Sequence, residues 1–367
     1  MSAVRAAVVR QVGAPFEVEE IELAPTGPGE VRVRMAASGV CHSDLSVQNG
    51  SIPFLFPTVL GHEGAGVVVE VGEAVTRVVP GDHVVLTWMP ACRRCFWCLS
   101  GQPMLCEVGL AEALGSPFAT AAGTPLVRGL GTATFSEQTL VPEAEVVRID
   151  PSVPLELAAL VGCALATGIG AVWHTAGVTP GSSVAVVGCG GVGLSVVQGA
   201  RLAGASTVVA VDRVAGKLEM AEAMGATATV DASAADVVAA VRAHTAGRGA
   251  DYCFEVVGRA DTIRSAFAAT RRGGTTVLVG AGSPAEQVSF SAFELFVDAK
   301  TVVGCVYGST DADRDFPVLV DLVRRGAIDA AGLVTRRISL DDLGDAFRAM
   351  EAGEVARSVI VYDTAGP

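Results

Sequence analysis

The stretch that decides the fold is Ser183-Val-Ala-Val-Val-Gly188-Cys-Gly190-Gly191-Val192-Gly193, an apolar run that ends in glycines spaced Gly-x-Gly-x-x-Gly. The apolar run predicts a buried strand, and residues 192–203 have the period of a helix. The glycines permit a tight turn and let a pyrophosphate approach the N-terminus of that helix. Strand, turn and helix together predict a dinucleotide site.

An acidic residue, Asp212, ends the next predicted strand, at the spacing of about twenty residues typical of such sites. Its carboxylate can accept hydrogen bonds from the hydroxyls of an adenosine ribose. Because a carboxylate repels a 2′-phosphate, Asp212 predicts NAD in preference to NADP. The neighbouring Arg213 weakens that preference.

Further short β-rich runs follow the same pattern, separated by segments of helical period such as residues 215–224. Alternation of this kind predicts βαβ units and a parallel sheet. The chain is expected to leave this sheet near residue 304 and to end with a helix at 340–352 and a strand at 358–362. The predicted strands are 183–187, 207–211, 228–230, 252–256 and 275–279.

The first part of the chain has a different sequence pattern. Short β-rich runs separated by turn residues predict an antiparallel β-domain. Residues 155–171 are small and apolar with helical spacing, and the residues between Cys106 and Gly131 show no clear period, which predicts a long loop. The β-rich runs are 6–9, 16–21, 30–35, 67–71 and 83–86.

Composition excludes several classes of protein. The 367 residues carry a formal charge of −13 with no basic cluster larger than an arginine pair, which argues against a nucleic-acid partner. The apolar stretches are far shorter than the ~20 residues of a membrane span, and the N-terminus shows no secretory signal. We therefore expect a cytoplasmic protein. Its nine cysteines are then expected to be metal ligands or buried thiols, in preference to disulfides.

Four cysteines lie close together in the sequence. The spacing Cys92-x2-Cys95-x2-Cys98-x7-Cys106 suits a structural zinc held by four thiolates. An iron–sulfur cluster uses the same ligands and is the chemical alternative. Burial as apolar core is the other alternative, which the polar surroundings of the four residues disfavour.

A second candidate set is dispersed along the chain: Cys41, His62 and Cys163. Each alone is more often structural than a ligand, but two cysteines and one histidine are the ligands of a catalytic zinc that leaves its fourth position open. Glu63 could be a transient extra ligand, and Asp44 is placed to orient a ligand from the second layer of contacts.

These residues together resemble the zinc-containing medium-chain dehydrogenase/reductases, and among them the alcohol dehydrogenases. The resemblance covers nearly the whole chain, from Gly39-Val-Cys-His-Ser-Asp44 and Gly61-His-Glu-Gly-Ala-Gly66 to Val355-Ala-Arg-Ser358. It implies a GroES-like β-barrel catalytic domain from residues 1–163 and 305–367, with a zinc lobe at 88–131. A Rossmann NAD-binding domain, a doubly wound parallel sheet, is implied for 164–304, so the fold class is α/β.

The resemblance also implies roles, position by position. Cys41, His62 and Cys163 match catalytic zinc ligands, and Glu63 matches the alternative ligand. Ser43 matches the hydroxyl that bridges the substrate oxygen and the nicotinamide ribose. For the cofactor, the resemblance implies that His42 and Arg357 contact the pyrophosphate, that Lys217 lies near the adenosine ribose, and that Thr167 and Val192 lie behind the nicotinamide. The remaining cofactor residues implied are Gly188, Gly190, Gly191, Gly193, Asp212, Arg213 and Arg259. Trp88 and Phe54 are implied to line the substrate pocket.

One position departs from the family pattern. Ser46 stands where several members have a relay histidine, so the outer proton path is open between His42 and water. The inner step through Ser43 is unaffected by this difference.

The function implied is NAD-dependent, zinc-dependent interconversion of primary alcohols and aldehydes, with hydrophobic or aromatic substrates expected first. The alternative is a mycothiol-dependent formaldehyde dehydrogenase, because the stretch that begins at Arg314 resembles actinobacterial members; Ile52 and Leu110 stand where glutathione-dependent members have charged residues. A remote alternative is a non-catalytic nucleotide-binding protein. Two zinc ions per chain are expected, and a homodimer paired near residues 301–306 is favoured over a tetramer.

Overall fold

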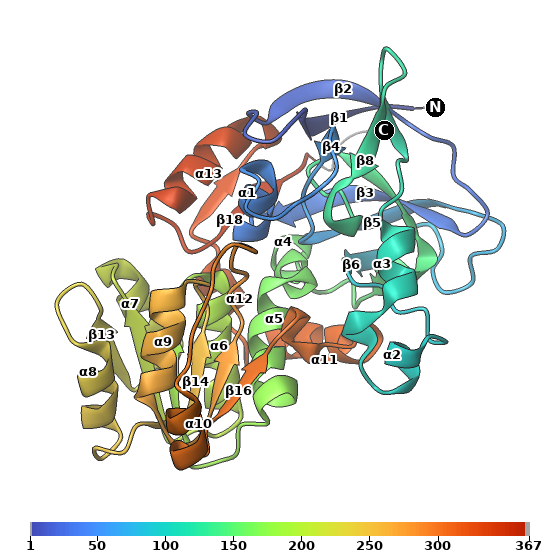
Figure 1. Ribbon diagram of the computed structural model, residues 1–367. Helices are drawn as coiled ribbons and strands as arrows, with labels where there is room; N and C mark the ends of the chain where they lie inside the picture. Colours follow the sequence, from blue (N-terminus) through green and yellow to red (C-terminus); the bar gives the residue numbers. More distant parts are fainter. Residues whose placement is uncertain (1, 364–367) are drawn as a thin grey trace. The chain divides into compact units, whose positions relative to one another are not determined.

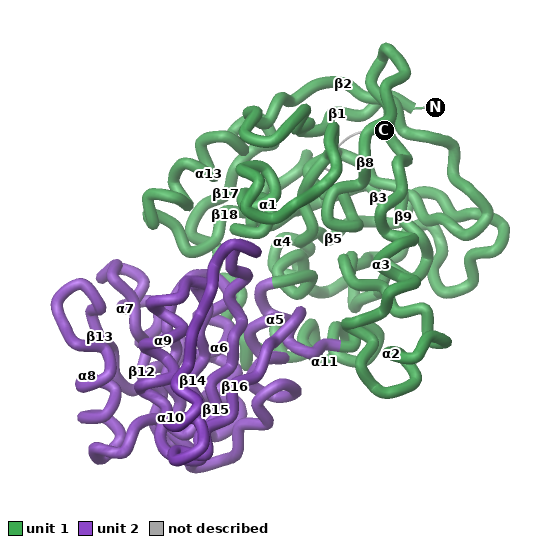
Figure 2. Tube along the Cα trace, viewed as in Figure 1, with its two compact units in different colours: residues 1–163, 311–367 green, residues 164–310 purple. Residues whose placement is uncertain are grey.

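The structure is a computed structural model that describes residues 2–363, so the predicted domain limits at Met1 and Pro367 lie outside the described residues. The chain forms two compact units (Figure 2). Unit 1 comprises residues 1–163 and 311–367, and unit 2 comprises residues 164–310. Each unit has its own sheets and its own core.

The first β-structure of unit 1 is a small closed barrel (Figure 1). Val4, Ala6 and Val8 alternate along its first strand and are buried together with Ile21 and Leu23, because successive side chains of a strand point to opposite faces. The strands, in order around the barrel, are β1 (Ser2–Val9), β2 (Glu17–Leu23), β7 (Phe118–Thr120), β8 (Pro125–Arg128) and β4 (Thr58–Val59).

The predicted long loop between Cys106 and Gly131 was wrong. The segment contains α3 (Glu107–Ala113), the hairpin of β7 and β8, and the 3₁₀ turn η2 (Gly129–Gly131). Phe118 and Leu126 of the hairpin are buried in the barrel. Strands of three and four residues are too short to show a period in the sequence, and their burial depends on partners far away in the chain.

The second sheet of unit 1 has seven strands and joins the two ends of the chain. The strand near the C-terminus pairs antiparallel with β3, in the register Ile360 to Ser38. Unit 1 therefore contains sequence from both ends of the chain. The path of the sheet is β10 (Val146–Arg148), β6 (His83–Leu86), β5 (Gly64–Val71), β3 (Glu30–Gly39), β18 (Ser358–Val361) and β17 (Arg336–Ile338), and β9 (Gln138–Pro142) also pairs with β3.

The helices of unit 1 are short apart from two near the C-terminus. The helix predicted at 340–352 is present as η7 (Leu340–Asp342) and α13 (Leu343–Glu351), which begin at a capping box of Ser339 and Asp342. Phe347 of α13 stacks on Phe16, with ring centroids 4.6 Å apart. The remaining helices are α1 (His42–Gln48), α2 (Phe96–Leu99), η1 (Pro103–Leu105), η3 (Glu143–Glu145), α4 (Leu155–Ala158), η4 (Ala159–Gly162), α11 (Ala312–Arg324) and α12 (Ala330–Leu333).

Unit 2 is built on a six-stranded sheet in which every neighbouring pair is parallel. Its central strands are rich in valine and buried, as expected for a parallel sheet with both faces covered. The five predicted strands are all present. In sheet order they are β13 (Ala228–Asp231), β12 (Thr207–Asp212), β11 (Ser183–Val187), β14 (Ala250–Glu255), β15 (Thr270–Leu278) and β16 (Thr301–Gly304).

Two pairs of helices cover this sheet. The pair α6 (Gly191–Leu202) and α7 (Ala215–Ala223) is in contact, as is the pair α8 (Val237–His244) and α9 (Ala260–Ala269). Because the strand order reverses after β13, right-handed crossovers place the two pairs on opposite faces. This is the doubly wound arrangement that was predicted. The other helical segments are α5 (Ala164–Gly170), the π-helical turn η5 (Ala171–Ala176), α10 (Ala292–Asp298) and η6 (Tyr307–Ser309).

The helix predicted over residues 155–171 is broken at Cys163. This residue has φ −145° and ψ −70°, outside the helical region, and it separates η4 from α5. The first of the two segments of unit 1 ends at the same residue. Unit 2 continues to Thr310, beyond the expected boundary at 304/305, and the hydroxyl of Thr310 donates to the carbonyl of Ala166 in α5.

No single helix among residues 2–363 is long and apolar enough to cross a membrane. One bent pair, Leu155–Gly162 with Ala164–Ala176, meets the same length and composition test when its two helices are taken together.

A buried arginine of β8, Arg128, ties α3 to the barrel. The Arg128 guanidinium donates to the carbonyls of Ala113, Leu140 and Glu112 at 2.9, 2.6 and 2.9 Å. The carboxyl group of Glu145 is wholly buried beside it, with 3.9 Å between Nη2 of Arg128 and Oε1 of Glu145. Burial raises the pKa of Glu145 to about 8, although the attraction of Arg128 lowers it, because at this distance the attraction does not offset the loss of water.

Replacing Glu145 by glutamine is therefore expected to remove a pH dependence of stability. Between about pH 4.5 and pH 8 the folded chain holds a proton on Glu145 that the unfolded chain has lost, so the free energy of unfolding falls as pH rises. From pH 6 to pH 8 the wild type should lose up to about 3 kcal/mol of unfolding free energy relative to the variant. Thermal unfolding at both pH values measures this difference, and parallel curves for the two proteins would contradict it.

Candidate functional site

Cys41, His62 and Cys163 meet in unit 1 although they are far apart in the sequence. Their ligand atoms all lie within 4.8 Å of one another, and all three residues are buried. Cys41 is the N-cap of α1, His62 directly precedes β5, and Cys163 occupies the break before α5. Because the backbone at Cys163 is not helical, its thiol lies close to Cys41 and His62, and a continuous helix would direct the side chain elsewhere.

Asp44 orients the imidazole of His62. Its carboxylate lies 3.1 Å from Nδ1 of His62, accepts the backbone N–H of Gly61 at 2.9 Å, and is fully buried. An ionised carboxylate at this position favours the tautomer with the proton on Nδ1, which leaves Nε2 free to bind a metal. Asp44 thus lies where the sequence predicted an orienting acceptor.

The electrostatics of the three side chains fit a divalent cation. A hydrogen bond from Cys163 holds the pKa of Cys41 well below its usual value, and the same contact together with burial raises the pKa of Cys163. Burial lowers the pKa of His62, but the charges of Asp44 and Cys41 outweigh it and raise it overall. Both buried thiols and the imidazole bind a metal in their deprotonated forms, which a divalent cation such as zinc, held by these three residues, would stabilise.

Glu63 and Arg357 form a buried ion pair beside these ligands. Their charged atoms are 3.3 Å apart, and Arg357 also donates to the carbonyl of Val40 at 2.9 Å. Gly39 makes room for the carboxylate, because a Cβ there would lie 1.9 Å from Oε2 of Glu63. The sequence shows Gly39 only as the first residue of the motif around Cys41, and it indicates no separate role for it.

The other residues predicted around the substrate lie in the same unit. The hydroxyl of Ser43 is 3.8 Å from the sulfur of Cys41, and the ring of Trp88 meets that of His62 edge-on at 6.1 Å. Phe54 is partly buried against the hydrophobic core. His42 is exposed at the first position of α1. Ser43 and Trp88 are thus brought to the candidate ligands.

Cys92, Cys95, Cys98 and Cys106 form a second cluster, with all four sulfurs within 4.8 Å of one another. Backbone N–H groups point at the sulfurs: Cys92 and Gly109 donate to Cys106, each at 3.2 Å, and Cys95 donates to Cys92 at 3.4 Å. Backbone hydrogen bonds from Arg94 and Cys95 lower the pKa of Cys92 to about 6. Donors aimed at sulfur stabilise thiolates, which fits a four-thiolate metal site.

The glycine loop of unit 2 lies at the carboxyl end of β11, where the strand order reverses. Gly188 has φ +97°, and a Cβ on Gly193 would lie 1.8 Å from the carbonyl oxygen of Gly188, so both positions require glycine. A Cβ on Gly190 would meet no atom within 4 Å, which leaves the N-terminus of α6 open to a ligand. The residues present fit a bound pyrophosphate.

Asp212 has a second task that the sequence did not show. One carboxylate oxygen accepts the N–H of Cys189 at 2.7 Å, and the other accepts the N–H groups of Arg213 and Val214 at 2.7 and 3.0 Å. It therefore fixes the glycine loop as well as ending β12. Arg259 forms an exposed ion pair with Asp261, 3.0 Å apart. The remaining predicted cofactor residues of unit 2 lie in its helices: Thr167 in α5, Gly191 and Val192 in α6, and Lys217 in α7.

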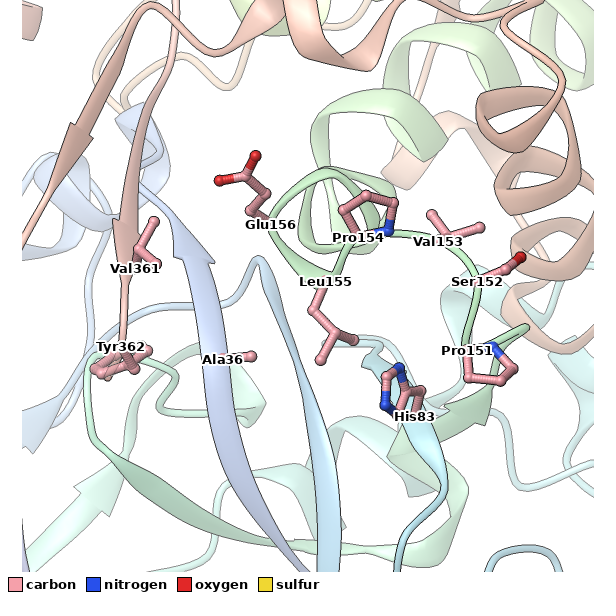
Figure 3. A pocket seen from close by; sticks show the side chains of 10 residues that line it. All are labelled: Ala36, His83, Pro151, Ser152, Val153, Pro154, Leu155, Glu156, Val361 and Tyr362. Atoms are coloured by element: carbon pink, nitrogen blue, oxygen red, sulfur yellow. The ribbon is translucent and has the colours of Figure 1, made fainter. Parts of the chain in front are cut away.

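A separate pocket of about 360 Å³ lies in unit 1 between residues 151–156 and the end of β18 (Figure 3). His83, Leu155, Glu156 and Tyr362 are among the side chains that line it. None of the predicted metal ligands lines this pocket. It is therefore distinct from the candidate catalytic site.

Comparison with known proteins identifies the class. Residues 27–151 match an alcohol dehydrogenase GroES-like domain, and residues 191–325 match a zinc-binding dehydrogenase domain. S-(hydroxymethyl)glutathione dehydrogenase of Synechocystis sp. is 41% identical, over 98% of this chain and 99% of its own length. These matches define a zinc-binding dehydrogenase of two domains.

Solved structures agree with this class. Benzyl alcohol dehydrogenase of Acinetobacter calcoaceticus is 31% identical with a TM-score of 0.92, covering 99% of this chain and 100% of that one. A zinc-binding dehydrogenase of Sinorhizobium meliloti, bound to NADP, is 31% identical with a TM-score of 0.83 over the same shares. The chain belongs to the zinc-containing medium-chain alcohol dehydrogenase family, which confirms the predicted family and the predicted fold class.

Family membership makes the protein a zinc-dependent oxidoreductase of the dehydrogenase type. The relatives change the order of the two substrate predictions. Full-length relatives named S-(hydroxymethyl)glutathione dehydrogenase favour the thiol-adduct alternative over hydrophobic alcohols as the first expectation.

Proposed function

We propose that this protein oxidises the hydroxymethyl adduct that formaldehyde forms with a small uncharged thiol, and that it uses NAD as the hydride acceptor. The observation that carries the proposal is the buried set of Cys41, His62 and Cys163, in a chain that matches S-(hydroxymethyl)glutathione dehydrogenases along its whole length. In this proposal unit 1 is the catalytic unit and unit 2 is the nucleotide-binding unit.

The residues of unit 1 would divide the work as follows. Cys41, His62 and Cys163 would hold zinc, which polarises the oxygen of an alcohol or aldehyde and stabilises its negative charge. Ser43, beside Cys41, would accept the proton of the substrate hydroxyl, and His42 or water would carry it outward. Asp44 would keep the His62 ring in place. A second zinc at the four-cysteine cluster would be structural.

The nucleotide preference rests on Asp212. Its carboxylate ends β12 at the open N-terminus of α6, and three backbone N–H groups fix its orientation. A fixed negative charge there favours ribose hydroxyls and repels a 2′-phosphate. We therefore infer a preference for NAD over NADP in this chain, although a relative binds NADP.

The charge near the site favours an uncharged thiol over glutathione. The sequence has no lysine or arginine between Arg34 and Arg77 or between Arg94 and Arg128, the two segments that supply Cys41, His62 and α3. Helix α3 packs against the turn after Trp88, since a Cβ on Gly109 would lie 1.8 Å from the carbonyl oxygen of Pro90. Glutathione carries carboxylates that call for cationic partners, whereas mycothiol carries none.

Steady-state assays test this proposal. With NAD as acceptor, formaldehyde plus mycothiol should give the highest kcat/KM, about 30-fold or more above formaldehyde plus glutathione, which is the ratio that ~2 kcal/mol of unpaired carboxylate produces. Formaldehyde alone is the control for the adduct. A glutathione adduct oxidised equally well would overturn the preference for an uncharged thiol, and faster turnover with NADP would overturn the cofactor preference.

Benzylic alcohols are the second candidate substrates. Leu55, Leu110 and Leu114 are exposed apolar side chains in the same cation-free segments, and a relative of matching fold is a benzyl alcohol dehydrogenase. A kcat/KM for benzyl alcohol above that for every thiol adduct would replace the first proposal by this one.

The assembly proposed from the sequence is a homodimer. β16 is an edge strand of the sheet in unit 2, and the preceding helix α10 exposes Phe293 and Phe296 to 75% and 82%. Unpaired edges with exposed aromatic side chains are typical of strands that pair with a second copy. Sedimentation velocity decides between this dimer and a tetramer.

A further inference from the structure

Arg93, in the middle of the cysteine cluster, has an unusual backbone. Its φ is +60°, in the left-handed region that costs a residue with a side chain ~1 kcal/mol or more. Cys92 and Cys95 flank the turn, and the N–H of Cys95 points at the sulfur of Cys92 at 3.4 Å. The closed arrangement of the cysteines therefore imposes this conformation, because nothing in the arginine itself favours it.

The side chain of Arg93 binds two aspartates near the start of α11. Its guanidinium donates to both carboxylate oxygens of Asp311 and to Oδ2 of Asp313, each at 2.6 Å. Arg77 also pairs with Asp313. This contact raises the pKa of Arg93 and lowers that of Asp311. This network of ion pairs joins Arg77 and Arg93 to residues 311–313, which are far away in the sequence.

Asp311 is the residue at which the chain returns from unit 2 to unit 1. It is also the N-cap of α11, and its turn is closed by hydrogen bonds of its own. The N–H of Asp311 donates to Asp315 Oδ2 at 2.9 Å, and the N–H groups of Arg314 and Asp315 donate to the Asp311 carbonyl at 3.1 and 2.8 Å. Arg93 thus binds the N-cap residue of α11, at the point where the chain returns to unit 1.

An exposed ion pair alone is worth little, because water and side-chain entropy offset most of its attraction. Three features distinguish this contact: it is bidentate, it belongs to a network of two arginines and two aspartates, and its backbone is held by the cysteine turn. The third feature makes the contact depend on the state of the cysteine cluster.

We propose that Arg93 is a positioning residue that couples the metal at the four-cysteine cluster to the order of residues 311–315. The proposal rests on the structural zinc proposed above and is independent of the substrate. With the metal bound, the turn at Arg93 is fixed and its guanidinium holds Asp311 and Asp313. Without it, the turn relaxes, the guanidinium is released, and the start of α11 opens more often.

Hydrogen exchange on the full zinc-loaded protein tests one direction of this coupling. In Arg93→Gln the amides of Asp311, Arg314 and Asp315 should exchange about 5-fold faster or more than in the wild type. Arg94→Gln is the matched control, because it removes a neighbouring exposed arginine from the same turn. Wild-type exchange in Arg93→Gln, or equal acceleration in Arg94→Gln, would overturn the proposal.

Arg93→Gly separates the side chain from the backbone. Glycine adopts positive φ without strain, so this variant should keep its zinc at least as well as Arg93→Gln does. Exchange at residues 311–315 should still be as fast as in Arg93→Gln. Wild-type exchange in Arg93→Gly would show that the guanidinium is not the cause and would reject the proposal.

The coupling should also act in the other direction, from residues 311–313 to the cysteine turn. The double variant Asp311→Asn, Asp313→Asn leaves the cysteine turn untouched, yet it should release the zinc of the four-cysteine cluster to a chromogenic chelator about 5-fold faster. Cys163→Ser identifies the release phase that belongs to this cluster, because it lacks a ligand of the other set. Asp321→Asn, which breaks exposed pairs later in α11, is the control. Unchanged release in the double variant would overturn the proposal.

Discussion

Cys163→Ser is expected to lower kcat/KM for alcohol oxidation by ~10³-fold or more while the variant still folds and still binds NADH. Cys163 supplies one of three buried ligand atoms within 4.8 Å of one another, and a serine hydroxyl is not ionised at neutral pH as a zinc-bound cysteine is. Loss of the metal removes several kcal/mol of charge stabilisation, and ~4 kcal/mol corresponds to this factor.

Three measurements on Cys163→Ser separate lost chemistry from lost structure. Zinc content should fall by one ion per chain, the thermal unfolding temperature should stay within a few degrees, and NADH fluorescence titration should give a Kd near that of the wild type, since the glycine loop lies in unit 2. Cys253→Ser is the matched control: it buries a hydroxyl in the core of unit 2 and should cost stability without costing activity. Substantial alcohol oxidation by zinc-depleted Cys163→Ser would refute the assignment.

Cys106→Ser is expected to have the largest effect on stability. Its sulfur is buried, accepts the N–H groups of Cys92 and Gly109, and lies 3.8 Å from the sulfur of Cys95. A structural zinc contributes ~10–16 kcal/mol of apparent binding free energy, so its loss should unfold the lobe at residues 88–131. The unfolding temperature should fall by about 10 °C or more.

Zinc analysis, thermal unfolding and limited proteolysis measure this result. Zinc should again fall by one ion per chain, and new cleavage sites should appear within residues 88–131. The same Cys253→Ser control shows how much a cysteine-to-serine change costs where no metal is expected. A Cys106→Ser protein with full zinc content and wild-type resistance to protease would contradict a structural metal at this cluster.

The candidate ligands could be named from the sequence because their chemistry is specific. Cysteines at three-residue steps bring their sulfurs together through local structure alone, so Cys92, Cys95 and Cys98 needed no knowledge of the fold. The dispersed trio was different: nothing local relates Cys41 to Cys163. Ligand chemistry suggested it and the resemblance to a family supported it, and the structure brings the three side chains within reach of one another.

Two segments of the sequence have local patterns that mispredict their structure, and the cause is the same in both. Residues 155–171 have the composition and period of one helix, yet the chain breaks at Cys163 between two units with separate cores. The segment from Cys106 to Gly131 has no period, yet its short strands close a barrel with β2 and β4. In both cases long-range packing outweighed the local pattern.

The sequence by itself determined the parallel sheet, the glycine loop and the four-cysteine cluster. Each of these depends on residues that are neighbours in the chain, where apolar period, backbone freedom and ligand spacing act directly. Only the tertiary structure decided the contacts between residues that are distant in the sequence. These are the approach of Cys41, His62 and Cys163 to one another, the room that Gly39 leaves for Glu63, and the hydrogen bonds from Arg93 to Asp311. Such contacts depend on how sheets and turns pack, and no local pattern encodes that packing.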